Sequence, residues 1–296
     1  MRIDRVSQRM RSLAMRSVFM QPVFLWITFF VLSCRPDYTK SQSEAAIQSL
    51  LFAGLSSSVA TCAQSYTGQA SVDTIIDQIK STYGVQPCVN LGPLPLFTLG
   101  TVTSSDYANL QTALTTLQTE FARYPIELVL RSRLRMISFP TSIGVPYGGT
   151  AGGFAPTELD FIMVRLQVSN IPFLKATIHH EFFHHLDEEK NGPRYYTDPT
   201  WRSYNYTYYS YGCNRSNTSA GIISPPAAGF LNTYSTCEVV EDKAEVYSNQ
   251  FILPNKTQIQ TLITNGDTAV AQKLDYVQRV AANFSSSINQ TFWNNL

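Results

Sequence analysis

The sequence is poor in charge and in histidine, and it lacks the motifs of several common protein classes. Charged residues make up 15% of its 296 positions, and the formal net charge is only +1. This balance gives no basis for binding nucleic acid, because that function needs an excess of clustered basic residues. The chain also contains no internal repeat and no glycine-rich phosphate-binding loop, which excludes a solenoid and a P-loop nucleotide site.

Histidine is confined to one segment of the chain. All four histidines lie between His179 and His185. Only His180 and His184 stand four positions apart, and on a helix that spacing places two side chains on one face. With Glu181 they form the pattern H-E-x-x-H, which supplies two neutral imidazoles for a zinc ion and a carboxylate that can take a proton from water. The pattern is typical of zinc metallopeptidases.

The surroundings of this pattern bear on whether it is a metal site or the solvated polar face of a helix. Apolar residues flank the histidines, which predicts a buried helix. They are Ile171, Phe173, Leu174 and Ile178 before the pattern, and Phe182, Phe183 and Leu186 within and after it. Buried histidines need polar partners, so the metal site is favoured.

A catalytic zinc site needs a third protein ligand and leaves its fourth position to water. The position six residues after His184 is Lys190, and no histidine remains elsewhere in the chain. Glu188 continues the same helical face, but it lies roughly 12 Å past His180 at about 1.5 Å per residue, which is too far for one ion. We therefore expect a carboxylate or a thiolate from a second helix.

The segment Cys237–Tyr247 is the best candidate for that second helix. Glu238, Glu241 and Glu245 recur in it at helical spacing. Its apolar faces would come from Val239, Val240, Ala244, Val246, Phe251 and Ile252. Three acids on one helical stripe repel each other unless something positive faces them, and a metal with its histidines would serve. The alternative is a solvated acidic stripe with Lys243 as its partner.

The two segments together resemble a known group of enzymes. A helix with H-E-x-x-H followed by a helix with E-D-x-A-E is similar to the gluzincin arrangement. It is similar in particular to a provisionally named group of zinc-binding metallopeptidases that are distantly similar to the protease domain of anthrax lethal factor. The resemblance implies that His180, His184 and Glu241 bind Zn²⁺, that Glu181 is the general base, and that Glu245 orients a ligating histidine.

The same resemblance, clearest over residues 158–250, assigns a role to a tyrosine. The lethal factor pattern places a tyrosine seven residues before the glutamate ligand, and that position here is Tyr234. Its hydroxyl would stabilise the oxyanion of the transition state. The alternative is one more aromatic residue in a tyrosine-rich region. That region, residues 193–230, fits either a substrate groove or a loop that packs its own aromatic side chains.

The first 34 residues resemble a signal sequence, with a basic leader followed by the apolar stretch Val18–Leu32. The segment ends at Cys34 in a sequence that resembles a bacterial lipoprotein processing site. A conventional cleaved signal and an uncleaved anchor are the alternatives, although about 15 apolar residues are short for a span of roughly 20. All three place residues 35–296 outside the cytoplasm, in a cell-envelope lipoprotein or a secreted protein. The membrane would be contacted only through this N-terminal lipid or signal anchor.

Four cysteines remain without Cys34, an even number that suits two disulfides in an oxidising compartment. Sequence order favours Cys62 with Cys88 and Cys213 with Cys237, although four cysteines permit three pairings. A bridge between Cys213 and Cys237 would tie the tyrosine-rich region to the second helix. It would also remove Cys237 as a competing thiolate ligand.

Hydrophobic periodicity indicates a mixed order of elements. It predicts helices at residues 42–55, 72–83 and 107–124, strands at 126–130, 134–139 and 158–166, a glycine-rich connection at 144–153, and two helices within 257–292. Zincins keep an edge strand just before the metal helix, whose backbone would pair with an extended peptide. A central strand is the alternative for residues 158–166.

These observations predict an α+β, zincin-like metallopeptidase domain at residues 35–296, with a small mixed sheet, several helices and a zinc cleft between two lobes. The expected activity is that of an extracytoplasmic zinc-dependent endopeptidase acting on peptide or protein substrates. The alternative is a lipid-anchored binding or adhesion protein that keeps the zinc site without hydrolysis. The presence of Glu181 favours the enzyme, because an inactive scaffold has no chemical need for the base.

Overall fold

The structure, a computed structural model, describes residues 60–95, 97–145, 149–156, 160–192, 196–206, 211–213 and 220–296. All of them belong to the unit Ile47–Leu296, one of two units into which the chain divides. The predicted leader at residues 1–34, with Cys34, and the predicted helix at 42–55 lie outside the described residues. Among the described residues, no helix is both long and apolar enough to span a membrane.

A four-stranded mixed sheet forms the β part of the fold. Its strands, in spatial order, are β2 (Gln86–Cys88), β5 (Met136–Ser138), β8 (Phe161–Val164) and β7 (Gly153–Phe154). The first three run parallel, and β7 pairs antiparallel with β8. The small mixed sheet and the strand predicted at residues 134–139 are confirmed.

Strand β8 is an inner strand, so the prediction of an edge strand at this position was wrong. It pairs with β5 on one side and with β7 on the other. All four of its residues are buried, and Phe161 and Met163 join a different apolar cluster from Ile162 and Val164. The covering strand β7 comes from the glycine-rich connection and is only two residues long, which leaves no alternating pattern for sequence periodicity to detect.

Two short antiparallel pairs accompany this sheet. They are β1 (Cys62–Gln64) with β3 (Asn90–Leu91), and β4 (Thr98–Leu99) with β6 (Ile143–Gly144). The disulfide between Cys62 and Cys88 joins β1 to β2, so this part of the predicted pairing is confirmed.

Among the described residues, the N-terminal half supplies three helices and a short 3₁₀ turn. They are α3 (Ala70–Tyr83), η1 (Ser104–Asp106), α4 (Tyr107–Phe121) and α5 (Ile126–Arg131). The helices predicted at 72–83 and 107–124 are confirmed, but the strand predicted at 126–130 is α5. Alternating apolar residues favoured a strand, yet Leu128 and Val129 are buried while Ile126 and Leu130 are exposed, and Pro125 stands at the N-cap.

The C-terminal half is helical. It contains α7 (Pro199–Tyr204), α8 (Val239–Ser248), η4 (Asn249–Phe251), α9 (Leu253–Thr264), α10 (Thr268–Ala282) and α11 (Gln290–Asn294). The two predicted C-terminal helices correspond to α9 and α10, and the short α11 follows them.

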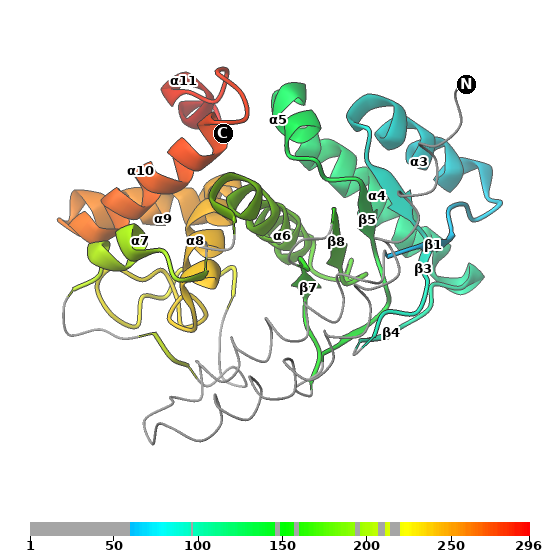
Figure 1. Cartoon of the computed structure of the whole chain (residues 1–296), viewed down its shortest axis with the longest axis horizontal. Helices are drawn as coiled ribbons and strands as arrows, with labels where there is room; N and C mark the ends of the chain where they lie inside the picture. Colours follow the sequence, from blue (N-terminus) through cyan, green and yellow to red (C-terminus); the bar gives the residue numbers. More distant parts are fainter. Residues whose placement is uncertain are drawn as a thin grey trace, which may run out of the picture. The chain divides into compact units, whose positions relative to one another are not determined.

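Helix α6 (Ile171–Asn191) connects the two halves (Figure 1). It packs against α4 and β8 on one side, and against α8 and α10 on the other. The helix begins where the Asn170 side chain accepts a hydrogen bond from the Phe173 amide, and it ends at Gly192. Its buried residues Phe182 and Phe183 belong to the main core, so the histidine pattern lies on a buried helix, as expected.

Two buried lysines fix α8 against its neighbours. Lys243, on α8, lies 2.9 Å from Asp187 on α6 and 2.9 Å from Asp198. Lys273, on α10, lies 2.6 Å from Asp242 on α8. The side chains of both lysines are 0% exposed. An uncompensated charge at such depth is costly, so these pairs specify how α8 sits on α6 and α10. Glu241 and Glu245 are themselves buried, so the alternative of a solvated acidic stripe is wrong for these two acids.

Trp201 and Tyr211, two aromatic residues of the tyrosine-rich region, pack in or against the main core, whereas Tyr206 is exposed. The Trp201 indole and the Tyr211 hydroxyl both donate to Asp242 Oδ2, at 2.9 and 2.6 Å. The predicted disulfide between Cys213 and Cys237 is present and links this region to the start of α8. The loop interpretation therefore holds for Trp201 and Tyr211, while Tyr195, Tyr208 and Tyr209 lie outside the described residues.

Candidate metal centre

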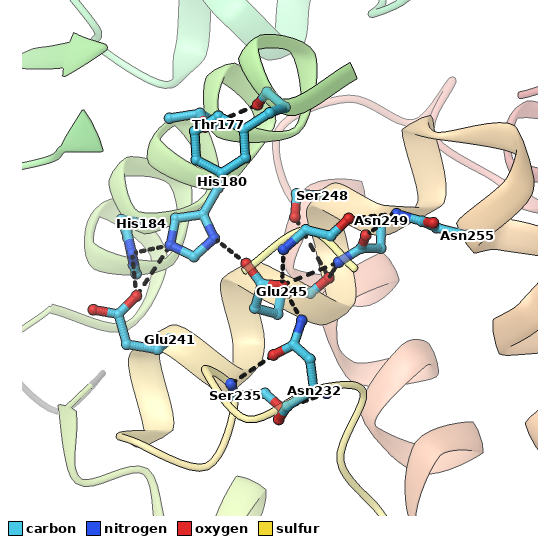
Figure 2. A network of polar contacts seen from close by, with 12 residues as sticks. Thr177, His180, His184, Asn232, Ser235, Glu241, Glu245, Ser248, Asn249 and Asn255 are labelled. Atoms are coloured by element: carbon cyan, nitrogen blue, oxygen red, sulfur yellow. Dashed lines mark hydrogen bonds and ion pairs between the residues drawn. The ribbon is translucent and has the colours of Figure 1, made fainter. Parts of the chain in front are cut away.

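His180 and His184 on α6 and Glu241 on α8 bring three potential ligand atoms together (Figure 2). His180 Nε2 lies 3.0 Å from Glu241 Oε2 and 3.1 Å from His184 Nε2. His184 Nε2 lies 3.4 Å from the same carboxylate oxygen. All three atoms fall within 4.8 Å of one another. The i, i+4 spacing on α6 supplies two of them, and the packing of α8 on α6 supplies the third.

Glu245 contacts His180 from the side opposite to Glu241 (Figure 2). Its Oε1 lies 3.1 Å from His180 Nδ1. A proton on Nδ1, donated to this carboxylate, leaves the Nε2 lone pair directed at the position shared with His184 and Glu241. Glu245 lies one helical turn after Glu241 on α8, so the spacing of the acidic stripe explains how the two carboxylates reach opposite sides of one imidazole.

The cluster favours a positive charge at its centre. Burial opposes protonation of His180, but hydrogen bonds with Glu241 and Glu245 outweigh it and raise the pKa of His180 well above its usual value. Burial likewise opposes ionisation of Glu241, yet hydrogen bonds from His180 and His184 hold its pKa well below the usual value. Two imidazole nitrogens and one carboxylate oxygen form the donor set of catalytic zinc sites with an open fourth position. The residues present therefore fit a zinc ion.

Glu181 is buried beside this cluster, with 5% of its surface exposed. Burial raises the pKa of Glu181 to about 7, although the nearby His180 and His184 act in the opposite direction. The carboxylate lies directly against the backbone of Gly153 in β7. A Cβ at position 153 would stand 2.6 Å from Glu181 Cγ and 2.7 Å from Cδ, distances that real Cβ atoms do not tolerate. The glycine is what allows the strand and the carboxylate to approach so closely.

Tyr234 precedes α8 and lies at the same site. Its ring centroid is 5.9 Å from that of His180, with the two ring planes inclined by 40°. The side chain is partly exposed. All residues that the sequence assigns to the site, namely His180, Glu181, His184, Tyr234, Glu241 and Glu245, are thus grouped around His180 in the folded chain.

No protein-family model matches this chain, and no curated protein matches it. A solved structure from Bacteroides caccae, which carries the provisional name zinc-binding metallo-peptidase, is similar. The match has a TM-score of 0.50 and 16% sequence identity, and it covers 76% of this chain and 89% of that chain. The chain has a metallopeptidase-like fold. At this level of identity the likeness concerns the fold alone.

In this metallopeptidase-like fold the other two histidines have separate partners. His179 is fully buried, with Nδ1 at 2.6 Å from the Tyr124 hydroxyl and Nε2 at 3.0 Å from Glu120 Oε2. His185 is buried as well, and burial lowers its pKa while a hydrogen bond with the Ser132 backbone opposes the shift. The run of four histidines therefore divides between the candidate metal centre and the interior of the fold.

Three residues that sequence analysis missed take part in this arrangement. Gly153 contacts Glu181, Asn232 donates to Glu245, and Glu120 holds the adjacent His179. None belongs to a motif, and each acts on a residue distant in the chain. The one local signal is that Asn232 stands two positions before Tyr234.

Proposed function

We propose that the protein is an extracytoplasmic zinc-dependent endopeptidase that hydrolyses peptide bonds in peptide or protein substrates. The observation that carries the proposal is the convergence of His180, His184 and Glu241 on one position, with Glu181 buried beside it. The resemblance to gluzincins and the metallopeptidase-like fold support the same assignment. In this proposal the site lies in a cleft between two lobes.

The chemistry follows from the groups around the site. Zinc, when bound, lowers the pKa of water towards roughly 7 and polarises the substrate carbonyl. Glu181 takes the proton of the attacking water and returns it to the leaving amine. A carboxyl whose pKa is about 7 can both accept and release a proton at neutral pH. Tyr234 donates a hydrogen bond to the oxyanion, and Glu245 keeps His180 in the orientation that binds metal.

The two disulfides support the proposed location outside the cytoplasm. Cys62 with Cys88 and Cys213 with Cys237 form bridges of a kind that persists in oxidising compartments. We expect the N-terminal segment, through Cys34 or an uncleaved signal, to be the sole attachment to a membrane.

The variant Glu181→Gln tests this function. It keeps the size of the side chain and removes the base, so turnover of a dye-quenched unfolded protein should fall by about 10²- to 10⁴-fold. The zinc content, measured by elemental analysis, should stay at the parent value. Cleavage by the variant at the parent rate would contradict the role of Glu181. Zinc binding by the parent without cleavage of any peptide in a library would favour the binding or adhesion protein instead.

A further inference from the structure

Asn232 is buried between the candidate metal centre and the turn that carries Tyr234 (Figure 2). Its side chain is 0% exposed. On one side its Nδ2 donates to Glu245 Oε2 at 2.5 Å. On the other side its Oδ1 accepts the Ser235 backbone N–H at 2.8 Å. The Ser235 hydroxyl also donates to the Asn232 carbonyl, at 2.8 Å. The Asn232 side-chain amide therefore forms hydrogen bonds with Glu245 and with the turn that carries Tyr234 at the same time.

The chemistry of these contacts requires an amide at this position. An ionised carboxylate only accepts, and a backbone N–H only donates, so the group between them must supply one donor and one acceptor. Asparagine does so with a side chain short enough to close a turn on its own backbone. Aspartate would keep the acceptor and lose the donor. Alanine would take one of its donors from Glu245 and would leave the buried Ser235 N–H without this acceptor, which is costly at this depth.

The contact with Glu245 acts on His180. Glu245 Oε2 receives three N–H donors, from Asn232, from the Gly221 backbone at 2.8 Å and from Asn249 at 3.3 Å. With Oε2 held in this way, Oε1 faces His180 Nδ1 at 3.1 Å. The position of the imidazole therefore depends on how firmly the carboxylate is held. Mutation of a residue that hydrogen-bonds to a metal ligand typically lowers metal affinity by about 10- to 100-fold.

The contact with Ser235 acts on Tyr234. The hydrogen bond between the Asn232 side chain and the Ser235 amide closes a four-residue turn, and Tyr234 stands inside that turn. The turn leads directly into Cys237, whose backbone N–H donates to the Tyr234 carbonyl at 3.0 Å. With its backbone held on both sides, Tyr234 places its ring beside that of His180.

We propose that Asn232 is a positioning residue that couples the orientation of His180 to the placement of Tyr234. The inference rests on the proposed function as far as the role of Tyr234 in turnover is concerned. The coupling itself is a property of the folded chain and is measurable without turnover. A change at position 232 disturbs the metal ligand and the oxyanion donor together, whereas a change at another donor to Glu245 disturbs the ligand alone.

The experiment compares Asn232→Ala with the control Asn249→Ala in the full-length protein. Asn249 is equally buried and also donates to Glu245, but it has no contact with the turn among the hydrogen bonds of the described residues. Zinc affinity is measured by competition with a fluorescent chelator. The position of Tyr234 is followed by ¹⁹F NMR of protein labelled with 3-fluorotyrosine, in which Tyr234→Phe identifies the resonance.

Both alanine variants should bind zinc about 10-fold more weakly than the parent. Only Asn232→Ala should shift the Tyr234 resonance. Asn232→Asp is a second variant of unchanged size for the case in which alanine unfolds the protein. Like charges at 232 and 245 repel and push the new carboxylate away from its position against Glu245 and Ser235, so the same two changes are expected. Parent values for zinc affinity or for the Tyr234 resonance in a folded variant at position 232 would overturn the proposal.

Turnover supplies an independent test of the same coupling. In the parent, Tyr234→Phe should lower kcat by about 10²-fold. In the Asn232→Ala background the same change should cost much less, because the hydroxyl is already displaced, while in Asn249→Ala it should cost the full amount. Equal costs in both backgrounds would overturn the coupling. A zinc-binding parent without turnover would refute the proposed peptidase, and the affinity and NMR measurements would then decide on Asn232.

Discussion

Gly153 lies so close to Glu181 that any side chain at position 153 would force the Glu181 side chain to move. The nearest atoms to a Cβ built on Gly153 all belong to the Glu181 carboxylate and its Cγ. Gly153 lies on β7 and Glu181 on α6, and no sequence motif includes both residues. The contact defines one wall of the space in which the proposed base can move, and its energetic consequences are measurable without any substrate.

Substitution Gly153→Ala should destabilise the protein by about 1–3 kcal/mol, the usual cost of overpacking a well-filled site. In a Glu181→Ala background the atoms that the new methyl group meets are absent, so most of that cost should disappear. The measurement is a double-mutant cycle of unfolding free energies from denaturant titration. An equal cost in both backgrounds would show that the methyl group conflicts with something other than Glu181.

The two disulfides offer a matched comparison, since their cysteines are 26 and 24 residues apart in the chain. Replacing either pair by serines should cost about 3 kcal/mol through loop entropy. Only the loss of the Cys213–Cys237 bridge should also weaken zinc binding, because Cys237 stands two residues before α8. Chelator competition on both variants checks this expectation. Equal zinc affinities in the two variants would mean that the bridge does not help to position Glu241.

Glu120 should contribute stability that depends on pH. Burial opposes its ionisation, but hydrogen bonds from His179, Lys175 and Arg123 outweigh burial and lower the pKa of Glu120 far below its ordinary 4.5. A depressed carboxyl pKa stabilises the folded state above the unfolded pKa, and this stabilisation is lost as the pH falls towards the folded pKa.

The variant Glu120→Gln isolates this contribution. It should be less stable than the parent by about 1–3 kcal/mol at pH 7, and the difference should shrink progressively as the pH falls below about 4.5. Denaturant titrations of both proteins between pH 7 and pH 3 provide the measurement. A difference that stays constant, or that grows towards low pH, would contradict the sign of the pKa shift.

Sequence analysis could predict those parts of the site that depend on spacing within one element. The spacing of four residues on a helix pairs His180 with His184, and the same spacing aligns Glu241 with Glu245. The resemblance to gluzincins then selects Glu241 as the metal ligand. The meeting of these side chains depends on how α8 packs on α6. That packing is set by the buried ion pairs Lys243–Asp187 and Lys273–Asp242. Sequence periodicity does not predict these pairs.

The misassigned elements have a related cause. Residues 126–130 alternate like a strand, but burial of Leu128 and Val129 together selects a helix. Strand β8 was expected at an edge because zincins keep an edge strand at this position. Its second partner β7, which overturns that expectation, is only two residues long and comes from a glycine-rich segment, so no periodicity predicts it. Gly153 and Asn232 escaped notice for the same reason, since each acts through a contact that exists only after the chain has folded.

We propose that His180, His184 and Glu241 hold one zinc ion. Elemental analysis of the purified protein, compared with His184→Ala and Glu241→Ala, tests it most directly. We expect one zinc per chain in the parent and loss or strong weakening of binding in both variants, with all three proteins folded. No zinc in a folded parent, or full zinc occupancy after the loss of Glu241, would contradict it.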